Sequence, residues 1–281
     1  MSAACSALPH STCPLCGGPN DCAPAACGDL NVACWCRDVN FSAELLAQVP
    51  AEQQRKACIC RRCATTLPPA QPQAIDLASY PRADILKAFV DRLMPQFSVT
   101  CEVDVTALKR ACEAAQVSFF LGLSYAVTRA VNAIPALRHR MIDGVLYEYP
   151  RTDPGYTVAR EGDLFSFCDG VYLEDFRAYC EEARARMEAV KTQPDLSVRE
   201  KHHMFFISSV PWLSFTGFTH PYDPRYGYVP VLTLGKYVAR GDALVMPVAI
   251  QVHHGTVDGV HVARFYEALN DTVQQAPNWM A

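Results

Sequence analysis

The cysteines are unevenly distributed, and this divides the chain into two parts that must fold by different means. Ten of the fourteen lie between Cys5 and Cys63, and only four follow: Cys101, Cys112, Cys168 and Cys180. A segment of this size holds too little apolar material to be stabilised by a core alone. We therefore expect the first part to depend on cross-links or metal, and the second to fold on an ordinary core.

The first residues, the length of the apolar runs and the net charge argue against several classes of protein. The first residues, Met1-Ser2-Ala3-Ala4-Cys5, lack the basic flank and apolar run of a secretory signal, and no run of 18 apolar residues occurs. We expect a cytoplasmic protein with no membrane partner. A net charge of -4 and a pI near 6.1 provide no general attraction for nucleic acid.

The clustered cysteines are more typical of metal ligands than of disulfides, because the thiols of a cytoplasmic protein are kept reduced. Two CxxC pairs can each offer two thiolates from one turn, which suits the tetrahedral sulfur shell of structural zinc. We expect eight ligands: Cys13, Cys16, Cys22, Cys34, Cys36, Cys58, Cys60 and Cys63. How these pair into sites stays open, as does the alternative of reduced thiols or disulfides without metal.

The segment also resembles a small bacterial cysteine-rich family known by its Cys-Trp-Cys signature. The matching stretches are Cys13-Pro-Leu-Cys16-Gly17, Asn20-Asp21-Cys22, Cys34-Trp35-Cys36 and Cys60-Arg-Arg-Cys63. The resemblance implies zinc and little about activity. We expect a cysteine-rich module over residues 1–66, a proline-rich linker over 67–74 and a second domain over 75–281.

The second domain alternates helical and strand patterns, which indicates an α/β or α+β fold. We expect a helix from Ser79 to about Leu93, a strand over Pro230–Val238 and a helix over Gly259–Gln275. The run Ala243–His253 has a nearly continuous apolar character and ends at two histidines, which indicates a strand covered on both faces.

The string with chemical content is Gln251-Val-His253-His254-Gly-Thr-Val-Asp258-Gly259, placed where that buried strand gives way to a helix. A neutral imidazole can take a hydroxyl proton near physiological pH, as acyl transfer to an alcohol requires. Asp258 can cap the following helix or pair with a cation. Taken alone, the same string also fits a hydrogen-bonded structural histidine pair followed by a simple turn.

The flanking sequence resembles the chloramphenicol acetyltransferase family over about residues 75–275. Beside the HHxxxDG motif, the matching stretches are Tyr80-Pro81-Arg82 with Phe89, Phe205-Phe-Ile-Ser208, Pro211-Trp-Leu-Ser-Phe215, Thr233-Leu-Gly-Lys-Tyr237, Gly241-Asp242 and Met246-Pro247. The resemblance implies a two-layer α/β sandwich of the CoA-dependent acyltransferase type. It implies direct transfer of acetyl from acetyl-CoA to a hydroxyl of a small molecule, such as chloramphenicol.

The resemblance also implies roles for individual residues. His254 would be the general base, and Asp258 would pair with Arg82 to support it. Thr233 would order a water near the reacting centre, and Phe89 would line the acceptor pocket, unless it is only a core residue. The resemblance further implies a homotrimer with each active site at a subunit interface.

One departure concerns the oxyanion. The family has a serine hydroxyl where this chain has Gly217, and loss of such a donor typically costs ~100- to 1000-fold in rate. Thr216, Ser214 or a backbone N–H near Gly217 can be considered as substitutes. The segment Thr219–Tyr226 also diverges, at the place where the acceptor would bind.

Two other functions stay open. Gly217 favours a non-catalytic binding or sensor protein whose cysteine-rich part responds to metal or redox state. The related histidine motif of dihydrolipoyl acyltransferases is a second alternative, against which stands the lack of a lipoyl-carrying segment.

Overall fold

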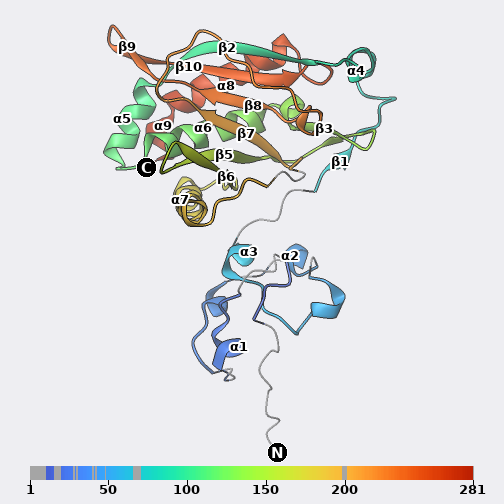
Figure 1. Cartoon of the computed structure of the whole chain (residues 1–281), viewed down its shortest axis with the longest axis vertical. Helices are drawn as coiled ribbons and strands as arrows, with labels where there is room; N and C mark the ends of the chain where they lie inside the picture. The colour runs from blue at the N-terminus through green and yellow to red at the C-terminus, as the bar shows by residue number, and fades with distance from the viewer. Residues whose placement is uncertain are drawn as a thin grey trace, which may run out of the picture. The chain divides into compact units, whose positions relative to one another are not determined.

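The computed structural model describes residues 11–15, 20–27, 29, 31–39, 41, 43–47, 49–65, 71–197 and 201–280. The chain divides into two compact units, Met1–Pro68 and Pro69–Ala281 (Figure 1). In the part of the chain that is described, no helix is long and apolar enough to cross a membrane. Of the expected features, Cys16 and residues 67–70 of the linker lie outside the described residues.

The smaller unit is built from short helical segments. These are α1 (Ala23–Cys27), the 3-10 helices η1 (Trp35–Asp38) and η2 (Ala51–Gln53), α2 (Ala43–Ala47) and α3 (Arg61–Thr65). Its apolar core is small and includes two of the cysteines: Cys13, Leu45, Val49, Ile59 and Cys60. A core of this size cannot offset the conformational entropy of so many ordered residues, so the unit needs further stabilisation.

The larger unit contains a mixed seven-stranded sheet in the order β2-β10-β8-β7-β5-β6, with β9 paired to the start of β10. The strands are β2 (Gln96–Asp104), β5 (Asp153–Arg160), β6 (Leu164–Asp169), β7 (Met204–Ser209), β8 (Val231–Leu234), β9 (Val238–Arg240) and β10 (Ala243–His253). β7 runs parallel to β5 and β8, and the remaining pairs are antiparallel. A separate three-stranded sheet joins β1 (Gln73–Ala74), β4 (Val145–Glu148) and β3 (His139–Ile142).

Helices cover one face of the large sheet. They are α5 (Thr106–Ala114), α6 (Phe119–Ala133), α7 (Phe176–Thr192), α8 (Gly259–Gln274) and α9 (Ala276–Trp279). The unit also contains α4 (Ala83–Val90), the 3-10 turn η3 (Pro135–Arg138), and the 3-10 turn η4 (Pro224–Tyr226) in the segment between β7 and β8. Figure 1 shows α6 and α8 behind the strands and α7 beside β6. The core lies between this helical layer and the sheet, so the fold is the expected two-layer α/β sandwich.

The expected elements differ from the observed ones in three places. The helix expected over 79–93 is only the eight residues of α4. The strand expected over 230–238 is interrupted at Gly235, where any side chain would meet the ring of Pro247 at 2.6 Å. β3 has no clear strand pattern in the sequence, and it forms because it pairs with β4. The largely apolar run 243–253 forms β10 with the expected bounds.

The face of the sheet away from the helices is polar. Side chains alternate between the two faces of a strand, so Leu232 and Leu234 of β8 enter the core while Thr233 points the other way. The same alternation places a row of polar residues across five strands: Ser98, Gln251, Thr233, Ser208 and Thr157. The segment between β7 and β8 lies over this face, because the Phe218 carbonyl accepts a hydrogen bond from Ser98 Oγ.

Candidate active site

His254 is the first residue after β10, and its position is fixed at both its backbone and its ring. Its backbone N–H donates to the Pro95 carbonyl at 2.9 Å, which continues the pairing of β10 with β2. Its ring Nδ1 lies 3.2 Å from the Val257 carbonyl oxygen. A carbonyl only accepts, so Nδ1 carries the proton of the neutral ring and Nε2 holds the lone pair. This is the tautomer that a general base acting through Nε2 requires.

Two phenylalanines flank the imidazole. The ring centroid of Phe89, on α4, is 4.4 Å from that of His254, and the centroid of Phe97, on β2, is 4.9 Å from it. These contacts limit rotation of the imidazole about its side-chain bonds. The structure thus places Phe89 directly against the candidate base.

Arg82 connects the loop of His254 to the start of α8. One guanidinium nitrogen is 3.5 Å from a carboxylate oxygen of Asp258, and another donates to the His254 carbonyl at 3.2 Å. Asp258 also caps α8 by accepting from the Gly259 N–H at 2.7 Å. This backbone hydrogen bond, with the charge of Arg82, lowers the pKa of Asp258. The carboxylate therefore stays ionised and holds both the helix and the arginine.

The neighbouring histidine, His253, is in a different environment. It is buried, its Nδ1 accepts from the Gly255 N–H at 3.0 Å, and its ring stacks on Tyr228 at a centroid distance of 3.8 Å. Burial lowers the pKa of His253 to about 4. Of the two histidines, His253 is buried and held by its contacts, as expected of a structural residue, whereas His254 is only partly buried.

Thr233 does not lie beside His254 of the same chain. Thr233 pairs with Ala249 on β10, and the five residues from there to His254 span about 16 Å of extended strand. Thr233 also faces the polar side of the sheet, whereas His254 contacts Phe97, which packs against the core on the helical side. One chain therefore carries two separate groups of expected site residues.

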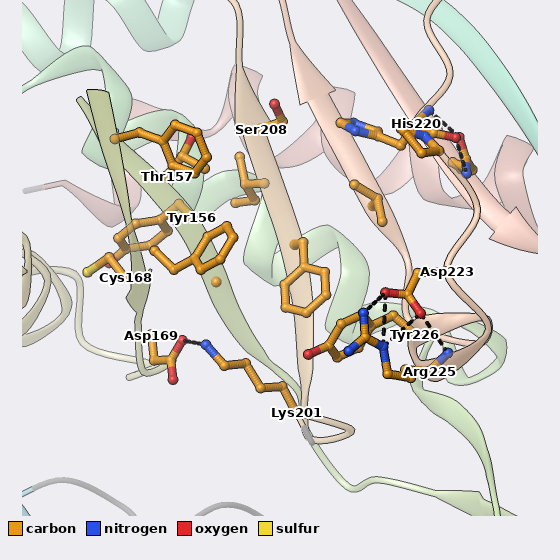
Figure 2. Close-up of a pocket in the computed structure, with 18 of the residues that line it drawn as sticks. Tyr156, Thr157, Cys168, Asp169, Lys201, Ser208, His220, Asp223, Arg225 and Tyr226 are labelled. Atoms are coloured by element: carbon orange, nitrogen blue, oxygen red, sulfur yellow. Dashed lines mark hydrogen bonds and ion pairs between the residues drawn. The ribbon is translucent and has the colours of Figure 1, made fainter. Parts of the chain in front are cut away.

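A cavity of about 420 Å³ opens on the polar side of the sheet (Figure 2). Tyr156, Thr157 and Cys168 lie on one side of it, and His220 with the segment of η4 lies on the other. Two ion pairs lie at the cavity: Lys201 with Asp169, and Arg225 with Asp223. Aromatic rings make up much of the wall: Phe165, Phe167, Phe206 and Tyr226. The cavity is therefore apolar in its walls and balanced in charge.

Sequence reasoning missed three residues at this cavity. His220 approaches Thr233 Oγ1 at 2.7 Å through its Nε2, and Gln251 with Gln96 holds the backbone of His220 in place. The available signal was the polar residue Gln251 inside the otherwise apolar run of β10, because a buried glutamine needs hydrogen-bond partners.

In the smaller unit, the sulfurs of Cys13, Cys60 and Cys63 all lie within 4.8 Å of one another. Cys60 and Cys63 belong to one CxxC turn, and the CxxC partner of Cys13 is Cys16, outside the described residues. A second group of sulfurs forms a chain of contacts: Cys58 lies 3.0 Å from Cys22, and Cys22 and Cys36 both interact with Cys34. The donor set of the first group fits a tetrahedral thiolate site for zinc.

Comparisons with known proteins agree with both units. The family described as Chloramphenicol acetyltransferase matches residues 71–270, and the family described as Cysteine-rich CWC matches residues 13–65. A chloramphenicol acetyltransferase of Escherichia coli is 32% identical over 211 residues, which are 73% of this chain and 94% of that protein. Chloramphenicol acetyltransferase 2 of Escherichia coli is 33% identical over 205 residues, 69% of this chain and 93% of that one.

Comparison with solved structures identifies the same family for the larger unit. A chloramphenicol acetyltransferase superposes with a TM-score of 0.68 at 32% identity, covering 72% of this chain and all of that one. A probable dihydrolipoamide acetyltransferase from Listeria monocytogenes, at 16% identity and a TM-score of 0.53, covers 73% of this chain and 95% of that one. The second likeness shows a shared fold alone.

Proposed function

The chain belongs to the chloramphenicol acetyltransferase family, whose members are acyltransferases, and on that premise we propose that it transfers acetyl from acetyl-CoA to a hydroxyl of a small molecule, with His254 as the general base. Chloramphenicol, or a compound like it, is the acceptor to test first. The observation that carries the proposal is the hydrogen bond from His254 Nδ1 to the Val257 carbonyl, which leaves the lone pair on Nε2.

The proposed reaction proceeds in one complex of protein, acetyl-CoA and acceptor. His254 Nε2 takes the proton of the acceptor hydroxyl as its oxygen attacks the thioester carbonyl. The carbon–oxygen bond of the new ester forms, the carbon–sulfur bond breaks, and the proton passes from Nε2 to the sulfur of CoA. The ring returns to its neutral state. Arg82 and Asp258 support this step by holding the loop of His254, and neither contacts the reacting atoms.

We propose that the active site is completed by a second copy of the chain within a homotrimer. The support is the separation of the two groups of expected site residues: His254 on the helical side, and Thr233 with Gly217 on the polar side. A polar sheet face with an open cavity fits a surface that meets another copy. The imidazole of one copy would then act on an acceptor held in the cavity of its neighbour.

The cavity supports a neutral acceptor with an aromatic part. Its volume of about 420 Å³ is within the range of small-molecule pockets. Its walls are rich in aromatic rings, and the charged side chains Asp169, Lys201, Asp223 and Arg225 that line it are paired with opposite charges. Phe89, Thr216 and Gly217 are proposed to contact the acceptor or the reacting acetyl group at the interface.

We propose that the cysteine-rich unit binds zinc. Cys13, Cys60 and Cys63 would hold one ion together with Cys16, and Cys22, Cys34, Cys36 and Cys58 would hold a second. Bound zinc would supply folding free energy that the small core lacks. Thiolate ligands must stay reduced, which supports a cytoplasmic location.

The test is thiol release by purified protein from acetyl-CoA in the presence of hydroxyl acceptors including chloramphenicol. We expect release that depends on the acceptor and that is lost in His254→Ala. His253→Asn is the matched control, because an asparagine amide can accept the Gly255 N–H in place of Nδ1. We expect His253→Asn to retain turnover, with some loss of stability.

Gly217 favours one other candidate function, a binding protein that has the fold but not the reaction. Such a protein would bind acetyl-CoA or an acceptor in the cavity without releasing thiol above background. Thiol release at background with every acceptor, together with measurable binding of acetyl-CoA, would replace the proposed function by this one.

A further inference from the structure

His220 has no counterpart in the motifs that identify the family, yet it contacts one of the residues expected at the reacting centre. It lies in the divergent segment between β7 and β8, and its Nε2 is 2.7 Å from Thr233 Oγ1. It lines the cavity proposed to bind the acceptor. No motif in the sequence predicts a function for this histidine, so we infer its role from its contacts.

The backbone of His220 is held on both sides by one glutamine. Gln251 Oε1 accepts from the His220 N–H at 2.7 Å, and Gln251 Nε2 donates to the His220 carbonyl at 3.2 Å. The second amide hydrogen of Gln251 bonds Gln96 Oε1 at 2.7 Å, and Gln96 in turn donates to the Gly227 carbonyl at 2.8 Å. This network connects the backbone of His220 to two strands of the sheet, β2 through Gln96 and β10 through Gln251. The imidazole is therefore held in a fixed position in an otherwise irregular segment.

The protonation state of His220 limits the hydrogen bonds that it can form with Thr233. Burial lowers the pKa of His220, so the ring is neutral at neutral pH and carries one N–H. If Nε2 carries that hydrogen, it donates to Thr233 Oγ1, and the hydroxyl hydrogen of Thr233 remains available for another acceptor. Among the described residues, no hydrogen bond is made by Nδ1 of His220, so nothing there demands the other tautomer.

Gly217 lies three residues before His220 and carries no side chain. A Cβ at this position would meet no atom within 4 Å. The space of the missing serine is therefore not filled by any residue that the structure describes. The stabilisation that the serine hydroxyl gives elsewhere in the family must come from another donor if the reaction is to proceed.

We propose that His220 is a positioning residue for acetyl transfer: it donates from Nε2 to Thr233 and leaves the Thr233 hydroxyl hydrogen for the water expected near the reacting centre, which stabilises the oxygen that becomes negative during the reaction. His220 and Thr233 together thus take over part of the role of the missing serine. This inference rests on the proposed function, because it concerns the same reaction.

A matched pair of substitutions separates the hydrogen bond from mere packing. Glutamine can place an N–H near the position of Nε2, whereas asparagine reaches only the position of Nδ1. We expect His220→Asn to lower kcat on the order of 10- to 100-fold, with KM for acetyl-CoA unchanged, and His220→Gln to restore much of the loss. In a Thr233→Val background, His220→Asn should have little further effect.

Gly217→Ser provides a second readout. The new hydroxyl fits the open space, so we expect it to raise kcat in His220→Asn by a larger factor than in the unmodified protein. Melting temperatures of all variants check that the fold is retained.

The outcomes are distinguishable. Equal kcat for the unmodified protein, His220→Asn and His220→Gln would overturn the role of His220 while the proposed function stands. Equal losses in His220→Asn and His220→Gln, or full additivity with Thr233→Val, would show that packing alone is involved and overturn it as well. If the unmodified protein releases no thiol with any acceptor, the proposed function fails, and this inference fails with it.

Discussion

Arg82 and Asp258 are 176 residues apart in the sequence, and their side chains meet at 3.5 Å. The contact joins the turn before α4 to the first turn of α8, and the same guanidinium binds the carbonyl of His254. Arg82 is 15% exposed in its side chain, whereas Asp258 is 45% exposed. The ion pair is thus half open to water, and its importance lies in the geometry that it imposes on the loop of His254.

Arg82→Met should therefore affect turnover more than stability. We expect kcat to fall on the order of 10- to 100-fold, because the loop loses the group that fixes its carbonyl, while melting shifts by only a few degrees. Arg240→Met is the matched control, since Arg240 forms an exposed pair with Glu102 at the edge of the sheet. Unchanged kcat in Arg82→Met, or an equal loss in both variants, would contradict the role given to Arg82.

Two buried histidines should make the protein less stable in acid. Burial lowers the pKa of both His253 and His139 to about 4. Between pH 6.5 and about 4 the unfolded chain binds protons that the folded chain does not, so the free energy of unfolding falls as the pH falls. Each group contributes a slope of at most about 1.4 kcal/mol per pH unit. The stability is fully present above pH 6.5.

Urea unfolding at pH 7.5, 6.0 and 5.0 measures this slope. His253→Asn keeps an acceptor for the Gly255 N–H and does not titrate, so we expect a shallower dependence than in the unmodified protein. Parallel curves for the two proteins would mean that His253 does not carry the effect.

Much of the fold follows from patterns that are local in the sequence. The apolar run of β10 indicated a fully covered strand, and the helical stripe of Val262, Phe265, Leu269 and Val273 is buried as its period requires. Strand boundaries were less predictable where tertiary contacts decide them. The close approach of Gly235 to Pro247 interrupts the strand expected over 230–238, and no local pattern indicates it.

Contacts between distant segments could not be predicted from sequence in the same way. Arg140 is fully buried and donates to four backbone carbonyls, those of Leu137, His139, His202 and Met204. Nothing in its neighbours along the chain distinguishes it from a surface arginine. His220 is a similar case, because its partners Thr233 and Gln251 come from strands that only the fold brings together. The resemblance to a family supplied His254, whereas it gave no indication of His220.

The two groups of cysteines predict a zinc content of two ions per chain. We expect Cys60→Ser and Cys22→Ser each to remove about one equivalent, since each loses a ligand from a different tetrahedral site. Cys27→Ser is the control, because Cys27 is exposed and belongs to neither group. Metal analysis of the purified full chain gives the stoichiometry. A content of one ion that Cys22→Ser does not change would reduce the proposal to the single site of Cys13, Cys60 and Cys63 with Cys16.

The separation of His254 from Thr233 leads to a prediction that does not depend on knowing the natural acceptor. If each active site takes its histidine from one copy and its threonine from another, two defective chains can complement each other when they assemble together. We would unfold and refold His254→Ala and Thr233→Val as an equal mixture and compare thiol release with that of each variant refolded alone. Random assembly restores about a quarter of the sites, because each needs an intact histidine beside an intact threonine. Release at the mean of the two separate variants would mean that both residues act from the same chain, and the subunit-interface site would have to be abandoned.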